Sequence, residues 1–294
     1  MDRATIRSIL VPTDFSQPAN VAFAHALRLA LALKAELDIF HVEPHNDTTD
    51  WRWAPPVLET LIRWGFLEEG ATEADLARLG IRARRTLSSG ERPDEAILHE
   101  MASSHADLVV MASHGRSGIA RWLQPSVSRP VALRAPVPVL LIPADSKGFV
   151  DEQTGYGTVS RVLLPVDVVP DPGPAFDAAG IFSRALPGDS TEFATFHVGL
   201  GHPALELMQV PAGARLHHWR AEGGVVESIA TTAFTWSADL VIVVTEGRQN
   251  FLDALRGSTV ERLMGATPKP LLIVPAGWGS WTERPSAPPV EMSL

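Results

Sequence analysis

An internal repeat is the feature of this sequence that most limits how the chain can fold. Residues 106–144 read ADLVVMASHGRSGIARWLQPSVSRPVALRAPVPVLLIPA, and residues 238–276 read ADLVIVVTEGRQNFLDALRGSTVERLMGATPKPLLIVPA. Asp107 and Asp239 are 132 residues apart, and Gly115 and Gly247 have the same separation. A constant offset over this length indicates two copies of one folding unit.

Each copy has the pattern of a parallel α/β sheet. Residues 108–111 form a short apolar run, which is typical of a strand buried on both faces. A polar loop, a helical segment and a second apolar run at 137–142 follow. Earlier in the first copy, strands are predicted at 8–14 and 37–42 with an amphipathic helix between them. This alternation predicts βαβ units, whose ligands bind outside the carboxyl ends of the strands.

The repeat also predicts the domain organisation. We expect a first domain at 1–146, a linker at 147–159, a second domain at 160–276 and a flexible tail at 277–294. His41 and Gly90 are 49 positions apart, whereas the matching His197 and Gly223 are 26 apart. The second domain has therefore lost 23 residues between its second and third strands, and its helix there is expected to be shortened or absent.

Composition excludes several classes of protein. The net charge is −9, so the basic surface that nucleic-acid binding needs is not expected. No apolar run reaches the roughly 18 residues of a membrane span. The chain has no cysteine, and its first residues do not resemble a signal peptide. We therefore expect a cytoplasmic protein.

These features together resemble the universal stress protein family, as two tandem copies over nearly the whole chain. The resemblance implies two doubly wound, Rossmann-like parallel sheets of five strands each, in the order 3-2-1-4-5. It also implies a pseudo-dimer within one chain, in which the edge strands at 137–142 and 271–274 pair antiparallel. A homodimer of the whole chain is a further expectation.

The resemblance also implies an adenine-nucleotide site, with ATP as the expected ligand. Nucleotide-binding members carry Gly-x-x-Gly, nine residues and then Gly-Ser or Gly-Thr, because glycines let backbone N–H groups approach phosphate oxygens. An aspartate after the first strand contacts the nucleoside, and a residue near the end of the second strand lines the adenine site. The matching positions are Asp14, Val42, Gly115 and Ser126 in the first copy, and Asp167, Val198, Gly247, Gly257 and Ser258 in the second. Arg248, which supplies local positive charge, and Thr259 are further candidate binding residues of the second copy.

Neither copy has the complete loop. The first copy has Ala112 at the first glycine position, and its Pro125 has no N–H to offer a phosphate. The second copy has Val244 at the first glycine position but keeps Gly257 and Ser258. If one site binds, we expect it to be the second, although Glu246 and the acidic second half oppose a phosphate.

Structural explanations compete with these assignments. Asp14 and Asp167 could cap the helices that follow them, and the glycines could serve only a backbone turn. The tryptophans at 51, 53 and 64 are expected to pack in the core, the alternative being an exposed contact patch.

The functional hypothesis is a stress-response binding protein rather than an enzyme, with neither catalytic residues nor a metal site assigned. The alternative is an interaction scaffold without nucleotide. A slow ATP hydrolase ranks last, because Ser126 and Ser258 have no evident base.

Overall fold

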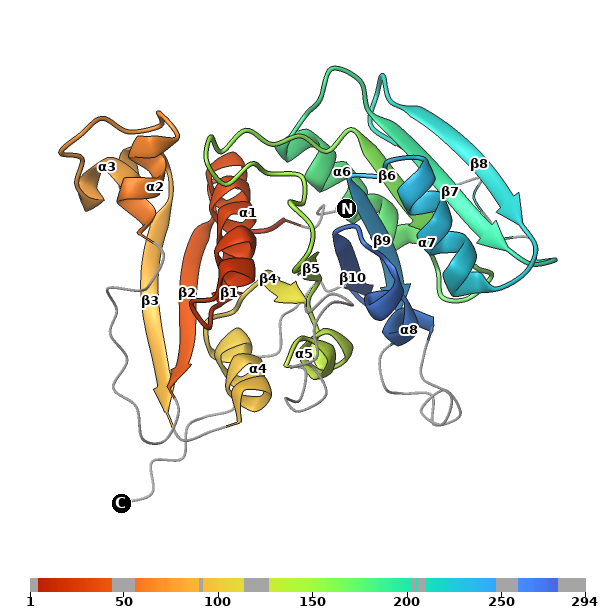
Figure 1. The fold of residues 1–294 in the computed structure, drawn as a ribbon, viewed down its shortest axis with the longest axis horizontal. Helices are drawn as coiled ribbons and strands as arrows, with labels where there is room; N and C mark the ends of the chain where they lie inside the picture. Colours follow the sequence, from red (N-terminus) through yellow and green to blue (C-terminus); the bar gives the residue numbers. More distant parts are fainter. Residues whose placement is uncertain are drawn as a thin grey trace.

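A single sheet of ten strands runs through the described part of the chain, in the order β3-β2-β1-β4-β5-β10-β9-β6-β7-β8 (Figure 1). The computed structural model describes residues 5–43, 56–89, 92–113, 127–201, 203, 205, 210–246 and 259–279. The strands are β1 Ser8–Pro12, β2 Glu36–Glu43, β3 Arg82–Ser89, β4 Leu108–Ser113, β5 Val139–Pro143, β6 Arg161–Pro165, β7 Glu192–Val198, β8 Arg215–Ala221, β9 Leu240–Thr245 and β10 Leu271–Pro275.

Each half of the sheet has the expected order 3-2-1-4-5, and this prediction is confirmed. Strands within each half are parallel, and the halves meet where β5 and β10 pair antiparallel. Leu140 lies opposite Leu272, and Val139 lies opposite Ile273. The expected pairing of the two edge strands is therefore confirmed as well. It merges the two five-stranded sheets into one and satisfies backbone groups that a free edge would leave open.

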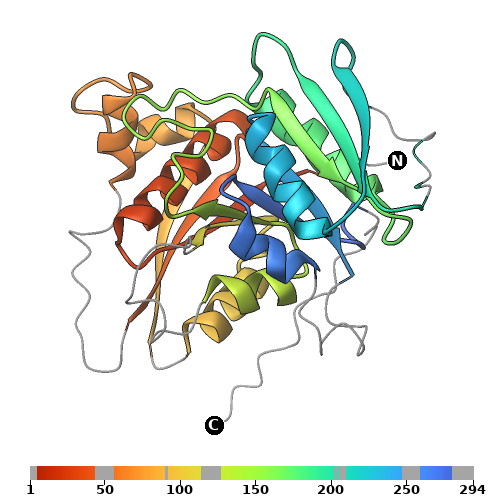
Figure 2. The same cartoon turned by 45° about the vertical axis from the view of Figure 1, so that its right-hand side comes forward.

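Helices cover both faces of the sheet and enclose two apolar cores (Figure 2). They are α1 Gln17–Leu33, α2 Val57–Arg63, α3 Glu73–Arg78, α4 Pro93–Ser103, α5 Ser128–Arg134, α6 Gly173–Ala185, α7 Val225–Thr235 and α8 Thr259–Ala266. Helices α1, α2, α3 and α6 pack on one face, and α4, α5, α7 and α8 pack on the other. Successive strand residues alternate between the cores, as Val11 and Leu10 do. This burial on both faces explains the continuous apolar runs in the sequence.

The helix that follows the loop of the first copy is short. Helix α5 begins at Ser128, and Pro130 lies in its first turn. The N–H groups of a first turn have no partner within the helix, so a proline is tolerated there. Pro130 therefore does not interrupt α5, which begins only two residues before it.

The segment predicted as a linker packs closely against the first half. Phe149 and Val150 are buried, and Val150 forms an antiparallel bridge with Gly157. His25 of α1 is fully buried, and its Nε2 accepts hydrogen bonds from the N–H groups of Phe149 (3.0 Å) and Val150 (3.1 Å). Its Nδ1 donates to the carbonyl of Val21 (2.8 Å). A neutral histidine in one tautomer thus ties this segment to α1.

The region between the second and third strands differs between the halves as the sequence predicts. Helices α2 and α3 occupy it in the first half, whereas the described residues between β7 and β8 contain no helix. Trp64 is buried at the end of α2, and its Nε1 donates to the carbonyl of Glu152 (3.0 Å). For Trp64 the prediction of core packing is confirmed; Trp51 and Trp53 lie outside the described residues.

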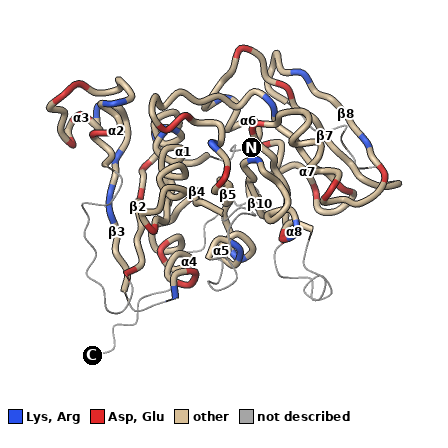
Figure 3. The backbone as a smooth tube through the Cα atoms, in the orientation of Figure 1, with Lys and Arg blue, Asp and Glu red and all other residues tan. Residues whose placement is uncertain are grey.

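The two outer strands of the sheet carry basic side chains (Figure 3). Arg84 of the edge strand β3 donates to Asp38 of β2 (2.6 Å), and Arg215 of the edge strand β8 donates to Glu192 of β7 (2.6 Å). Charged side chains on edge strands disfavour pairing with other chains. The sheet therefore ends on charged strands at both sides.

The buried His25 predicts a loss of stability in acid. Burial lowers the pKa of His25 to about 4, from an ordinary value of 6.5. Between pH 6.5 and pH 4 the imidazole is protonated in the unfolded chain but neutral in the folded chain. The contribution of His25 to the free energy of unfolding is therefore complete above pH 6.5 and is lost as the pH falls toward 4. Urea unfolding measures this effect. From pH 7.5 to pH 5.0, the free energy of unfolding should fall by about 2 kcal/mol more in the wild type than in His25→Asn.

The exposed His105 supplies the control for this experiment. His105→Asn should keep the pH dependence of the wild type. Parallel pH profiles for wild type and His25→Asn would contradict the role given to His25.

Candidate functional site

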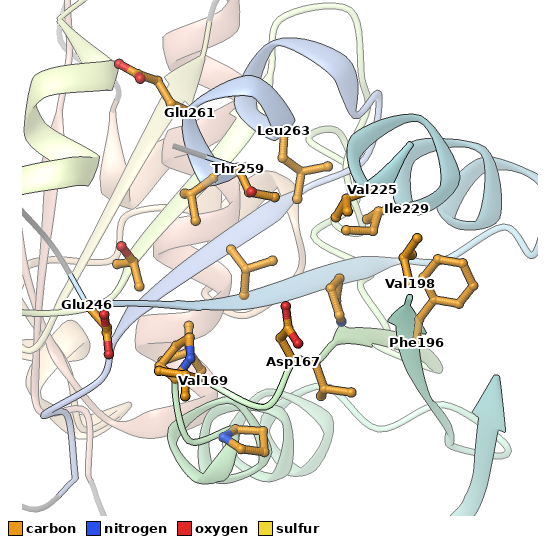
Figure 4. A pocket seen from close by; sticks show the side chains of 18 of the residues that line it. Asp167, Val169, Phe196, Val198, Val225, Ile229, Glu246, Thr259, Glu261 and Leu263 are labelled. Atoms are coloured by element: carbon orange, nitrogen blue, oxygen red, sulfur yellow. The ribbon is translucent and has the colours of Figure 1, made fainter. Parts of the chain in front are cut away.

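A cavity of about 390 Å³ lies at the carboxyl ends of β6 and β9 in the second half (Figure 4). Chain connections leave β6 and β9 in opposite directions along the sheet, and open α/β sheets bind ligands at such a point. The described residues that line the cavity are Leu133, Pro165, Val166, Asp167, Val169, Pro170, Pro172, Phe196, Val198, Val225, Ile229, Val243, Val244, Thr245, Glu246, Thr259, Val260, Glu261 and Leu263.

The first half has a smaller cavity of about 180 Å³ at the equivalent place, between β1 and β4. Among the residues that line it are Asp14, Ser16, Val42, Ser113 and Ser128. Typical small-molecule sites have volumes of about 300–1,000 Å³, so only the second cavity falls in that range.

The start of the first helix in each half explains this difference in size. Helix α1 begins at Gln17, three residues after Asp14, whereas α6 begins at Gly173, six residues after Asp167. The start of α1 closes over the first cavity, to which Ser16 contributes. In the second half, a longer turn of valines and prolines forms the rim instead.

The two aspartates lie where the sequence places them, directly beyond β1 and β6. Asp14 Oδ1 accepts a hydrogen bond from the Ser16 N–H (3.0 Å), and Asp167 Oδ1 accepts from the Val168 N–H (2.7 Å). The N-cap of α1 is Ser16, and that of α6 is Pro172, so neither aspartate is the cap residue. The Asp167 side chain is 67% exposed and lines the cavity, where a ligand could reach its carboxylate.

A histidine holds each aspartate-bearing turn, which the sequence reasoning missed. His41 Nδ1 donates to the carbonyl of Thr13 (2.8 Å), and His197 Nδ1 donates to the carbonyl of Val166 (3.0 Å). Asp167 Oδ1 lies 3.8 Å from the same His197 nitrogen. The signal was present, because Phe-His-Val occurs at the end of the second strand in both copies.

The apolar end of the second cavity is formed by side chains from β7 and α7. Phe196 and Val198 face Val225 and Ile229 there (Figure 4). This surface offers a flat aromatic group contact on several sides. Val42 lines the first cavity in the same way, and the adenine contact that the family resemblance implies for both valines stays a prediction.

The other end of the cavity carries the charge. Asp167, Glu246 and Glu261 are acidic, and none of its described lining residues is Lys, Arg or His. Glu261 forms an ion pair with Arg129 of α5, which offsets one of these negative charges. Thr259, the first residue of α8, also lines this end.

The remaining predicted residues belong to the two phosphate loops. Gly115 and Ser126 of the first loop, and Gly247, Arg248, Gly257 and Ser258 of the second, lie outside the described residues. The described ends of the second loop, Glu246 and Thr259, both line the larger cavity.

The described residues contain neither a candidate metal centre nor a membrane-spanning helix. None of their His, Asp and Glu side chains form a group of three or more that could hold a metal ion. None of their helices is long and apolar enough to cross a membrane.

Comparison with known proteins identifies the family. The model of the universal stress protein family matches residues 5–143 and 200–275, one stretch in each half and most of the chain together. The chain belongs to the universal stress protein family. A universal stress protein of Thermus aquaticus is 32% identical over 136 residues, which cover 46% of this chain and 98% of that protein. The universal stress protein YxiE of Bacillus subtilis is 28% identical over 144 residues, covering 46% of this chain and 97% of its own length.

A solved structure matches both halves at once. The crystal structure of a universal stress protein from Archaeoglobus fulgidus has a TM-score of 0.65 at 19% identity, covering 92% of this chain and 97% of that one. At this level of identity the likeness concerns the fold. The tandem fold is therefore shared with another universal stress protein.

The family match is less complete in the second half. It begins at residue 200 there, after β6, α6 and β7, and so omits Asp167 and Val198. Their equivalence to Asp14 and Val42 depends on the topology. The aspartates follow the first strand of each half, and the valines lie at the end of the second strand.

Removal of the His197 imidazole should destabilise the fold. His197→Leu leaves the Val166 carbonyl without its partner, and an unsatisfied buried acceptor costs about 1–3 kcal/mol. The exposed His99 of α4 is the control, because a surface substitution changes stability by about 0.5 kcal/mol or less. Thermal and urea unfolding of His197→Leu and His99→Leu measure the difference. Equal stability of the two variants would contradict the role assigned to His197.

Proposed function

We propose that this universal stress protein family member is a stress-response binding protein that takes an adenine nucleotide in its second half. The observation that carries the proposal is the cavity of about 390 Å³ between β6 and β9. It lies where this fold binds ligands, its volume suits a small molecule, and it has an apolar end and a polar end.

The roles follow the family resemblance and the geometry of the described residues. Asp167 would contact the ribose, and Val198 with Phe196 would pack against adenine. Thr259 and the loop residues Gly247, Arg248, Gly257 and Ser258 would bind the phosphates, with ATP as the proposed ligand. Buried charge-assisted hydrogen bonds of this kind are worth roughly 1.5–3 kcal/mol each.

Two equivalent valines give a matched test of the site. Val198→Trp fills the adenine end of the larger cavity, and Val42→Trp makes the same change in the smaller one. Overpacking of this kind costs about 1–3 kcal/mol, so calorimetry should show ATP affinity about tenfold lower or worse for Val198→Trp. Val42→Trp should bind as the wild type does.

The reverse pattern, with loss only in Val42→Trp, would move the site to the first half. An absence of binding in the wild type would instead support the scaffold alternative. That alternative is favoured by one observation: Asp167 and Glu246 line the cavity, none of its described lining residues is basic, and these negative charges oppose a phosphate.

The other proposals concern the setting of this activity. We place the protein in the cytoplasm, with domains at 1–146 and 160–276 joined by 147–159. Binding rather than catalysis is proposed: Asp167, Glu246 and Glu261 line the cavity, but no contact among the described residues singles out one of them to activate a water for slow ATP hydrolysis.

A further inference from the structure

The second cavity is lined in part by the first half of the chain. Leu133, at the end of α5, belongs to its wall, although every other described residue of the lining comes from the second half. Helix α5 reaches the cavity because it packs against α8 across the junction formed by β5 and β10. By contrast, all described residues that line the first cavity belong to the first half.

An ion pair crosses the same junction beside the cavity. Arg129 of α5 donates through Nε to Oε1 of Glu261, in the first turn of α8. The Glu261 side chain is only 16% exposed, whereas that of Arg129 is 56% exposed. In Figure 4 the Glu261 carboxylate projects outward from the cavity wall.

The repeat explains why this pair is informative. Arg129 and Glu261 are 132 residues apart, the offset that relates the two copies, so they hold equivalent positions in the two halves. Two identical halves would place like charges together here, which is unfavourable. Leu133 is equivalent to Gly265, which has no side chain to offer the other half. At this pair of positions the first half therefore supplies a side chain to the cavity of the second half, whereas Gly265 supplies none to the first.

We propose that the second cavity is a composite site, in which α5 of the first half sets both its shape and its charge. Leu133 forms part of the wall, and Arg129 neutralises Glu261, another residue of that wall. Arg129 is a positioning residue here, because it acts through Glu261 and does not line the cavity itself. This inference rests on the proposed function of the same site.

The chemistry predicts which ligands depend on Arg129. Without Arg129, the unneutralised carboxylate of Glu261 would make the cavity wall more negative, and none of the described lining residues is a Lys, Arg or His that could offset it. A more negative wall opposes the phosphates of ATP. Adenosine has no phosphate and should be nearly insensitive to that charge. The first half would thus determine how well the second half discriminates a phosphorylated nucleotide from its nucleoside.

Calorimetry with ATP and adenosine on the full-length protein tests the charge. Arg129→Gln should weaken ATP binding about three- to fivefold and leave adenosine binding unchanged. The control is Arg134→Gln on the same helix, because Arg134 pairs with Glu95 of α4 and not with the second half. It should bind both ligands as the wild type does. The double variant Arg129→Gln/Glu261→Gln should recover the ATP affinity, which a merely structural role of Arg129 would not produce.

Leu133→Ala tests the shape. Loss of its apolar contact should weaken ATP and adenosine by a similar factor of about five. Leu58→Ala on α2 removes the same groups away from the cavity and should leave both affinities unchanged.

The outcomes separate this inference from the proposed function. If the wild type binds neither ligand, the proposed function and the composite site both fail. If the wild type binds ATP and Val198→Trp weakens that binding, but Arg129→Gln and Leu133→Ala have the same affinities as their control variants, only the composite site is overturned. Equal losses of ATP and adenosine in Arg129→Gln would overturn the charge mechanism.

Discussion

The antiparallel pairing of β5 with β10 is the contact on which the rest of the architecture depends. Each half alone would end in an apolar strand with unpaired backbone groups, an arrangement that favours association. Pairing of these two strands satisfies those groups and lets the apolar cores on both faces continue across the junction. It also brings α5 against α8 and α1 against α6. The contacts of α5 with α8 and of α1 with α6 therefore follow from the register of β5 against β10.

Duplication followed by divergence describes the two cavities. Both lie at the same place in the same topology, yet their volumes differ about twofold. The difference arises largely from where the first helix begins after the aspartate, since α6 starts later than α1. The junction adds a second difference, because Leu133 contributes to one cavity and its counterpart Gly265 has no side chain. Small local changes thus give one fold two unlike sites.

The segment between the halves is part of the folded core. His25 accepts two backbone hydrogen bonds from this segment, and Trp64 donates one to it. Gly148 lies so close to His25 that a Cβ there would be 2.1 Å from Nε2. A side chain at Gly148 would therefore collide with the imidazole. The close fit makes the segment a structural connection, where composition alone indicated only a glycine-containing linker.

The sequence by itself determined the features that local pattern encodes. The repeat gave two copies of one unit, the apolar runs gave strands buried on both faces, and strand ends placed Asp14 and Asp167 at the cavities. The resemblance to a family supplied the strand order and the pairing at the junction. The roles of the loop residues around Gly257 stay predictions. Only the tertiary structure decided the size of each cavity, the His25 contacts, and the approach of Leu133 and Arg129 to the second half. These depend on packing between residues more than a hundred positions apart, and neither periodicity nor spacing within one copy carries that information.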